Sequence, residues 1–174
     1  GTHCPNAAFV ADCAFNGVIA ALRPAPFPGP LEEGCRRFCE KLDIHGVYHF
    51  DFLFVESEDR HYFLEMNGRL GGTTAKVFRL GYDEPGFVPG AYGTGRRPIS
   101  RPVPNRQVAS YQATAKFLLS SLRGQLTMFD YPNLGFWRLA IKLLPAVLSA
   151  RSEVWDWRYP RTSIAYAIQQ VLRL

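Results

Sequence analysis

Apolar and polar positions alternate along the first 67 residues in a pattern that predicts two β-hairpins. Residues 7–20 alternate around Asn16-Gly17, and Asn-Gly between apolar residues is the strongest short signal for a two-residue hairpin turn. Residues 46–55 and 61–67 are rich in aromatic and β-branched side chains, and the polar run 56–60 separates them. We therefore expect a second hairpin there.

The sequence pattern of the rest of the chain predicts mainly helices. A proline-rich connector at residues 23–30 precedes an amphipathic helix at about 31–42, whose apolar stripe consists of Leu31, Cys35, Phe38, Cys39 and Leu42. Later segments predict a proline- and arginine-rich connector at 96–106 and helices at 113–122, 134–148 and 160–174. Pro145 is expected to bend or break the second of these, and Pro160 to lie in the first turn of the third. The predicted fold class is α+β: an antiparallel sheet with flanking helices and a mainly helical C-terminal extension.

Two carboxylates in the second hairpin are the main chemical signal. If the turn is centred on Glu58, Asp51 lies directly opposite Glu65, and such pairs are about 4.5–5.5 Å apart at Cβ. Asn67 follows two residues after Glu65 and shares its face. Facing carboxylates repel each other unless a cation lies between them. Two carboxylates and an amide oxygen are ligands that Mg²⁺ accepts beside substrate phosphates, and Mn²⁺ is an alternative ion.

A simple solubilising role for these acids is the alternative, and the composition of the hairpin disfavours it. The face of Asp51 also carries Val47, Leu53 and Val55, with Phe63 beside Glu65 on the other strand. The opposite face is assigned Tyr48, Phe50, Phe52, Phe54, Tyr62, Leu64 and Met66. Because both faces are largely apolar, we expect the sheet to be covered on both sides, and an acid within it to be paired or metal-bound.

A glycine-rich turn at residues 68–74 follows the hairpin and leads into a predicted helix. Its glycines, Gly71 and Gly72 among them, allow close approach of backbone to a ligand, and Arg69 supplies a fixed cation for phosphate or carboxylate. Thr73 or Thr74 is expected to cap the helix, whose first amides favour an anion. His49 would face Asn67, where we favour a structural role over contact with phosphate.

The run Asp51…Glu65-Met-Asn67-Gly-Arg69-Leu-Gly71-Gly72 resembles the metal-binding end of the ATP-grasp superfamily. The similarity is closest to the carbamoyl-phosphate-synthetase and biotin-carboxylase branch, although Gly68 stands where that branch usually has proline. The resemblance implies that Asp51, Glu65 and Asn67 bind Mg²⁺. It also implies that Asn67, Arg69, Gly71 and Gly72 contribute to the nucleotide site, and that Arg69 contacts the transferred phosphoryl group or the acceptor carboxylate.

By the same resemblance, the chain is the C-terminal part of a longer ligase. Residues 1–95 would be a partial C-terminal ATP-grasp lobe, residues 96–174 a helical extension, and the nucleotide-clamping half would precede Gly1. The implied reaction uses ATP to activate a small-molecule carboxylate as an acyl phosphate for attack by an amine or similar nucleophile. We expect this part alone to be inactive and to bind nucleotide weakly. The alternatives are a non-catalytic ATP-grasp-like interaction module and an ATP-grasp kinase.

Composition and charge indicate which class of protein the chain belongs to and which partners to expect. A hydrophobic content of 47% with 14% aromatic residues is that of a globular protein, not a disordered one. The net charge of +5 is interpreted as a solvated basic surface near a phosphate site, so neither nucleic acid nor a membrane is expected as a partner. For the helix at 134–148 we favour packing on the missing half of the enzyme or on a substrate region, without which the helix would expose a large apolar patch. Binding of a membrane surface through Arg138 and Lys142 is the alternative. The cysteines, Cys4, Cys13, Cys35 and Cys39, fit free thiols of a cytoplasmic protein better than a zinc site.

Overall fold

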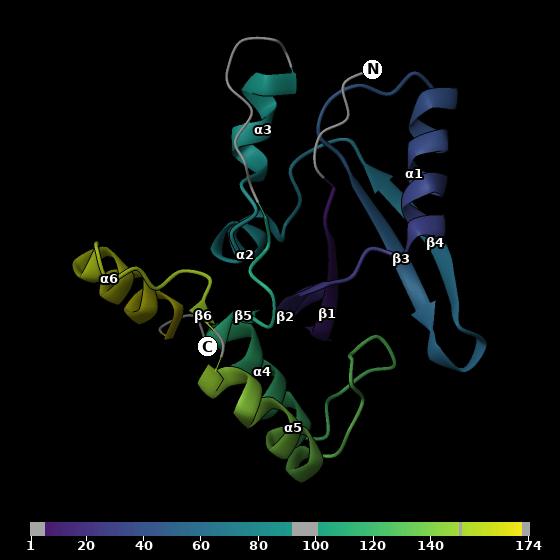
Figure 1. Ribbon diagram of the computed structural model, residues 1–174. Coiled ribbons are helices and arrows are strands. Elements are labelled where there is room, and N and C mark those ends of the chain that lie inside the picture. The colour runs from purple at the N-terminus through teal and green to yellow at the C-terminus, as the bar shows by residue number, and fades with distance from the viewer. Residues whose placement is uncertain (1–5, 92–100, 150, 172–174) are drawn as a thin grey trace. The chain divides into compact units, whose positions relative to one another are not determined.

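The chain forms an α+β structure with two compact units. The computed structural model describes residues 6–91, 101–149 and 151–171 (Figure 1). Unit 1 consists of residues 1–8 and 25–102, and unit 2 of residues 9–24 and 103–174. Contacts therefore group most of the first hairpin with the C-terminal residues. The sequence-based boundary at 95–96 falls outside the described residues and stays a prediction.

The described residues of unit 1 form a two-stranded antiparallel sheet and three α-helices. Its elements are α1 (Gly29–Lys41), β3 (His49–Val55), a short 3₁₀ turn (Glu56–Glu58), β4 (Arg60–Asn67), α2 (Thr74–Arg79) and α3 (Glu84–Ala91). The predicted hairpin and its preceding helix are confirmed. Helix α3 was not predicted from the sequence, although Asp83 marks its start: the Gly86 backbone N–H donates to Asp83 Oδ1 at 3.0 Å.

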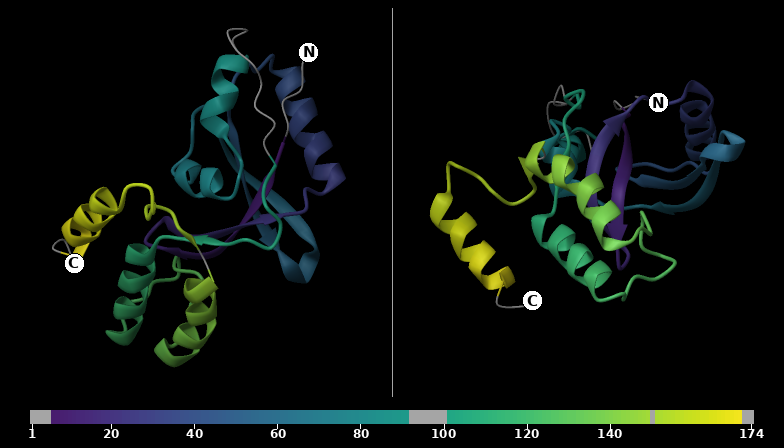
Figure 2. Two further views of the ribbon diagram at one scale, coloured as in Figure 1. Left: turned by 60° about the vertical axis from the view of Figure 1, so that its left-hand side comes forward. Right: turned by 90° about the horizontal axis from the view of Figure 1, so that it is seen from below.

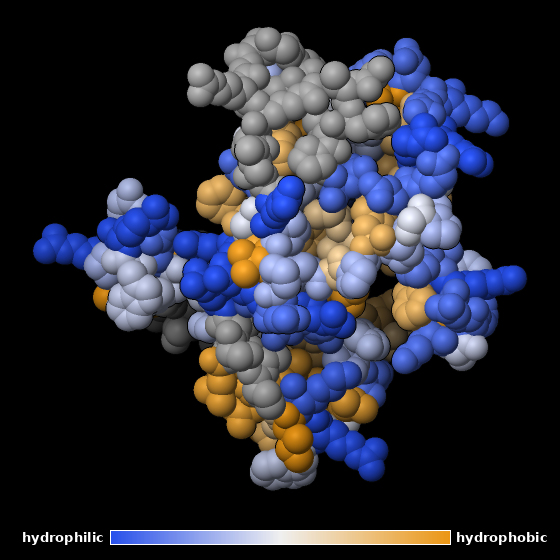
Figure 3. Space-filling view, viewed as in Figure 1, coloured by the Kyte–Doolittle hydropathy of each residue, from blue (hydrophilic) through white to orange (hydrophobic). Residues whose placement is uncertain are grey.

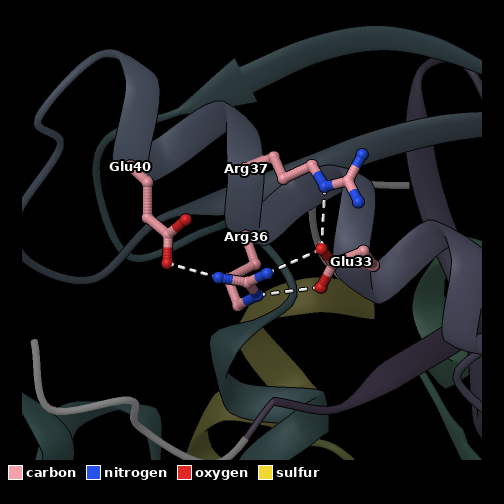
Figure 4. Close-up of polar contacts among 4 residues, drawn as sticks. All are labelled: Glu33, Arg36, Arg37 and Glu40. Carbon is pink, nitrogen blue, oxygen red and sulfur yellow. Dashed lines mark hydrogen bonds and ion pairs between the residues drawn. The ribbon is translucent and has the colours of Figure 1, made fainter.

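Helix α1 packs an apolar stripe on the hairpin and turns a charged stripe outward. The Phe38 ring lies 5.6 Å from that of Phe50 and 5.8 Å from that of Phe63, measured between ring centroids. On the polar side, Arg36 donates to Glu33 and Glu40, and Arg37 donates to Glu33 (Figure 4). The hydrogen bonds from Arg36 and then Arg37 lower the pKa of Glu33 to about 2. Such exposed pairs contribute little stability each, so aromatic packing holds α1 in place.

A β-bulge changes which side chains share a face of the hairpin. Asp51 pairs with Glu65, but the next residue, Phe52, pairs with Phe63, so Leu64 is the extra residue. The predicted faces are therefore wrong for β4 on the turn side of Glu65: Phe63 joins the aromatic face and Tyr62 the acidic one. The physical reason is that one inserted residue inverts the alternation of the strand.

The expectation of apolar cover on both faces is also wrong. The aromatic face contacts α1, whereas Leu53, Tyr62 and Leu64 are exposed, as are Asp51 and Glu65 themselves. A one-sided hairpin explains this, because antiparallel strands need only one packed face. The acids thus lie on an accessible surface and not in a closed core.

Unit 2 is a small mixed sheet covered by helices. Its elements are β1 (Ala8–Phe15), β2 (Val18–Ala25), β5 (Val108–Ala109), α4 (Tyr111–Leu122), α5 (Phe136–Ser149), β6 (Arg151–Ser152) and α6 (Pro160–Val171). The sheet order is β1-β2-β5-β6, with β2 antiparallel to β5 and β5 parallel to β6. In the predicted turn, Asn16 and Gly17 have φ of +49° and +74°, as the hairpin turn requires.

The core of unit 2 lies between the sheet and the pair α4–α5. These helices lie side by side in all three ribbon views (Figures 1 and 2). Buried residues from both layers form one cluster: Cys13, Ala20, Ala21, Ala109, Phe117, Leu139 and Leu143. Phe15 stacks on Phe117 with centroids 5.3 Å apart.

Two details of the predicted helices differ in unit 2. Helix α4 starts at Tyr111, two residues earlier than expected, because the Ser110 side chain accepts a hydrogen bond from the backbone N–H of Ala113. Helix α5 continues through Pro145 as one element, so this proline does not break it. The predicted last residues of α6, 172–174, lie outside the described part of the chain.

Candidate functional site

The acid pair, Asp51 and Glu65, lies where the sequence pattern predicts it. The two residues are direct partners in the ladder between β3 and β4, and His49 pairs with Asn67 one step further along the same face. The bulge at Leu64 lies immediately on the turn side of the acid pair. Bulges are frequent beside functional sites, because they re-aim side chains.

Asn67 brings the three groups together. Its Nδ2 lies 2.8 Å from Glu65 Oε1 and 3.3 Å from Asp51 Oδ2. The amide therefore donates to both carboxylates and relieves part of their repulsion. To ligate a cation, Asn67 must present Oδ1, which requires rotation of its amide group.

The pKa of Asp51 is raised above its ordinary value. Partial loss of solvent around the carboxyl contributes most, followed by the negative charge of Glu65 and the hydrogen bond between the two side chains. His49 and the Asn67 amide act in the opposite direction. A carboxyl group whose pKa is raised in part by a second carboxylate gains from a cation, because the cation removes the repulsion.

His49 links the hairpin to the glycine-rich turn. His49 Nε2 lies 3.3 Å from the Gly71 backbone nitrogen and 3.2 Å from Glu84 Oε1. Without a proton, Nε2 accepts a hydrogen bond from the Gly71 N–H; with a proton, it donates to Glu84 instead. The hydrogen bond with Glu84 is the largest cause of the raised pKa of His49. Burial of the ring lowers this pKa, the negative charges of Glu84 and Asp51 raise it further, and the positive charge of Arg69 lowers it. His49 thus has a structural contact, as we favoured, at the base of the turn.

Gly71 is required by this packing. A Cβ atom on Gly71 would lie 2.6 Å from His49 Cε1 and 2.7 Å from His49 Nδ1, too close for any side chain. Gly72 has nothing within 4 Å of the corresponding position. The two glycines therefore differ: one permits contact with His49, and the other has open space around it.

Glu84 is a residue of this region to which the sequence pattern assigned no role. It is only 6% exposed, and its second oxygen accepts a hydrogen bond from Thr74 Oγ1 at 2.8 Å. It connects α3 to β3 and to the start of α2. The sequence Asp83-Glu84-Pro85 was a signal for the start of a helix, but it did not indicate the contacts of Glu84.

The expected threonine cap of α2 is wrong. The Thr73 side chain makes no capping hydrogen bond, and the Thr74 hydroxyl donates to Glu84 instead. With six residues, α2 is also too short to provide a strong dipole. Anion binding at this turn would therefore depend on Arg69, which is exposed and donates from Nη1 to the Leu70 carbonyl at 3.2 Å.

The chemistry available at this surface is that of two facing carboxylates and an amide, with Arg69 two residues after the amide in the chain. Within the described ranges, no cluster of three or more His, Cys, Asp or Glu side chains is arranged as a metal site. Mg²⁺ is usually held by one or two carboxylates together with water and substrate phosphates. The acid pair with Asn67 has this composition.

Comparisons with known proteins do not assign the chain to a family. No protein-family model, no curated protein and no solved structure matches it. The geometry of the acid pair is therefore the basis for assigning a function.

Proposed function

We propose that the chain is the C-terminal part of an ATP- and Mg²⁺-dependent ligase of ATP-grasp type, which activates a carboxylate for attack by an amine or similar nucleophile. The observation that supports this most is the pairing of Asp51 with Glu65, with the Asn67 amide within hydrogen-bonding distance of both. Arg69 and the glycine-rich turn follow directly in the chain, in the order of the ATP-grasp motif.

In this proposal Asp51, Glu65 and Asn67 hold the metal, and Arg69 binds the transferred phosphoryl group or the acceptor carboxylate. Bound Mg²⁺ would neutralise negative charge on the phosphates. The γ-phosphoryl group passes to a carboxylate oxygen, with release of ADP, and the nucleophile then attacks the acyl carbon and expels phosphate. Arg69 follows Asn67 by two residues in the turn that packs on His49, and in this proposal it reaches the substrate from there.

The proposed compartment is the cytoplasm. Cys13, Cys35 and Cys39 are free thiols among the described residues, which fits a reducing environment. Such a compartment also supplies ATP.

The test is ATP turnover by the protein encoded by the complete gene, with Asp51→Asn/Glu65→Gln as the variant. We expect turnover to fall at least a hundredfold, which corresponds to about 3 kcal/mol of transition-state stabilisation. Glu56→Gln/Asp59→Asn removes the same two charges at the hairpin tip and should leave turnover unchanged. Wild-type turnover in the Asp51/Glu65 variant would remove the metal-site assignment.

Hydroxylamine trapping separates ligation from simple phosphoryl transfer. A ligase forms an acyl phosphate, which hydroxylamine converts to a hydroxamate while phosphate is released. A kinase of the same superfamily gives a stable phosphorylated product and no hydroxamate. We expect the hydroxamate, formed only in the presence of ATP and the carboxylate.

A further inference from the structure

Helix α5 carries an apolar stripe that no other described residue covers. Trp137, Ile141, Leu144 and Leu148 follow one another at intervals of four, three and four residues, so they line one side of the helix. They are 77%, 73%, 59% and 78% exposed. The adjacent side of α5 is the one that enters the core through Leu139 and Leu143. Figure 3 shows apolar surface gathered in the region of α4 and α5.

Apolar exposure continues into the loop that precedes α5. Met128 and Phe129 are 85% and 79% exposed, and Tyr131 is exposed as well. Lys142 Nζ lies 5.7 Å from the centre of the Tyr131 ring, so this loop borders the basic side of the helix. Contiguous apolar surface of this kind marks an interaction site.

The positive charge of the chain is concentrated in the same unit. Unit 2 holds ten basic and four acidic residues, whereas unit 1 holds ten basic and eleven acidic ones. No acidic residue occurs between Asp130 and Glu153, the span that includes α5. Arg138 and Lys142 are exposed on the helix beside the stripe. The surface that covers the stripe should therefore be apolar within and negatively charged at its border.

A second copy of the chain does not fit this requirement. Two α5 helices would bring Arg138 and Lys142 of each copy close to one another, where like charges repel. Nucleic acid offers negative charge but no apolar layer for Ile141, Leu144 and Leu148.

An anionic lipid surface meets both conditions. An interfacial helix presents Trp and aliphatic residues to the acyl boundary and Lys or Arg to the headgroups. A fluid surface also accommodates Met128 and Phe129 in an irregular loop, which a single partner helix would not cover. No described helix is long and apolar enough to cross a bilayer, so contact with the surface is the relevant mode.

We propose that α5 and the loop before it bind an anionic membrane surface, with the stripe Trp137, Ile141, Leu144 and Leu148 inserted at the acyl boundary and Arg138 and Lys142 paired with lipid headgroups. The negatively charged cytoplasmic leaflet supplies such lipids. Binding would hold unit 2 on the membrane peripherally and reversibly. The Asp51–Glu65 pair belongs to unit 1, and the proposal does not depend on it.

The test is flotation of the whole 174-residue chain with vesicles of phosphatidylcholine containing 30% phosphatidylserine, compared with pure phosphatidylcholine. We expect binding to the anionic vesicles to be at least tenfold stronger and to weaken as salt increases. Absence of binding to either vesicle, or equal binding to both, would overturn the proposal.

Surface variants test the assignment to α5. Ile141→Ser and, separately, Trp137→Ser should each reduce vesicle binding about tenfold. Both side chains are exposed, so far-UV circular dichroism should show an unchanged fold. The matched control is Ile168→Ser on α6, an isoleucine that is 56% exposed and lies outside the stripe. An equal loss in the control would overturn the assignment.

Charge variants test the headgroup contact. Arg138→Gln/Lys142→Gln should weaken binding to anionic vesicles about thirtyfold, because each cation near such a surface contributes roughly a factor of five. Lys41→Gln/Arg60→Gln removes two exposed cations of unit 1 and should have little effect.

Analytical ultracentrifugation tests self-association through the same stripe. If the chain does not bind vesicles and instead forms a dimer that Ile141→Ser abolishes, the proposal is overturned in favour of self-association.

Discussion

Asp51 and Glu65 form a direct cross-strand pair at the point where the β3–β4 ladder meets the bulge at Leu64. Two like charges at such a position cost free energy, because directly opposed carboxylates repel. The Asn67 amide offsets part of this cost by donating to both. The hairpin thus keeps an unfavourable pair on an accessible face, which is the arrangement expected of a binding site that a cation completes.

Asp51→Asn should stabilise the metal-free hairpin at pH 7. Removal of one charge ends the repulsion and should raise the free energy of unfolding by up to about 1 kcal/mol. Because folding raises the pKa of Asp51, its ionisation costs stability as the pH rises through the folded pKa. The advantage of the variant should therefore vanish below about pH 3.8. Hydrogen exchange of the β3 amides provides the measurement, and a variant less stable than wild type at pH 7 contradicts it.

Substitutions of the two adjacent glycines should differ in effect. Gly71→Ala places a methyl group against the His49 ring and should destabilise unit 1 by about 1–3 kcal/mol. Gly72→Ala meets open space and should change stability by less than about 0.5 kcal/mol. Hydrogen exchange of the α2 and β3 amides measures both. Equal effects of the two substitutions would show that contact with His49 does not restrict Gly71.

Asp130 is expected to anchor unit 2. Its oxygens accept hydrogen bonds from Asn16 N at 2.8 Å, Thr127 N at 2.7 Å and Thr127 Oγ1 at 2.9 Å. Asp130→Asn turns an NH₂ group toward such donors and should cost about 1–3 kcal/mol in urea unfolding followed by tryptophan fluorescence. All three tryptophans belong to unit 2. Asp43→Asn, whose side chain is 91% exposed, is the control and should be neutral.

The contribution of Asp130 to stability should depend on pH with the opposite sign to that of Asp51. Burial raises the pKa of Asp130, but the hydrogen bonds from Asn16 and Thr127 outweigh it, so the net shift is downward. Its contribution should be complete above about pH 3.8 and be lost as the pH falls through the lower folded pKa. The stability difference between wild type and Asp130→Asn should accordingly shrink in acid. A difference that grows in acid contradicts the assignment.

The chain on its own should bind Mg-ATP weakly. Asp51, Glu65, Asn67 and Arg69 account for only part of a nucleotide clamp under the proposed function. Isothermal titration should give a dissociation constant in the millimolar range, equivalent to about 4 kcal/mol of binding free energy. Micromolar affinity would show that the described residues already form a complete nucleotide site.

The local pattern of the chain was sufficient for elements whose stabilising interactions lie close in sequence. Asn16-Gly17 predicted the first turn, and the alternation around 56–60 predicted the second hairpin with Asp51 opposite Glu65. The stripe through Phe38 predicted α1 and its packing face. These features depend on turn chemistry and side-chain period, which a single sequence shows directly.

Features that depend on tertiary contacts were not predictable in this way. The bulge at Leu64 inverted the expected faces of β4 on the turn side of Glu65, and no glycine or proline marks it. Strands β5 and β6 have two residues each, too short for any period, and exist because they pair with β2 and with each other. Glu84 could be assigned no role from sequence, because its partners His49 and Thr74 lie 35 and 10 residues away.

The most direct test of the central claim is Mn²⁺ binding to the chain at pH 7, followed by electron paramagnetic resonance. We predict one site with a dissociation constant in the range of about 0.1–1 mM, typical of a weak oxygen site with few charged ligands, and at least tenfold weaker binding in Asp51→Asn/Glu65→Gln. Glu56→Gln/Asp59→Asn should bind as wild type does. Undiminished Mn²⁺ binding in the Asp51/Glu65 variant, or no binding to wild type, would contradict the claim that this pair holds a divalent cation.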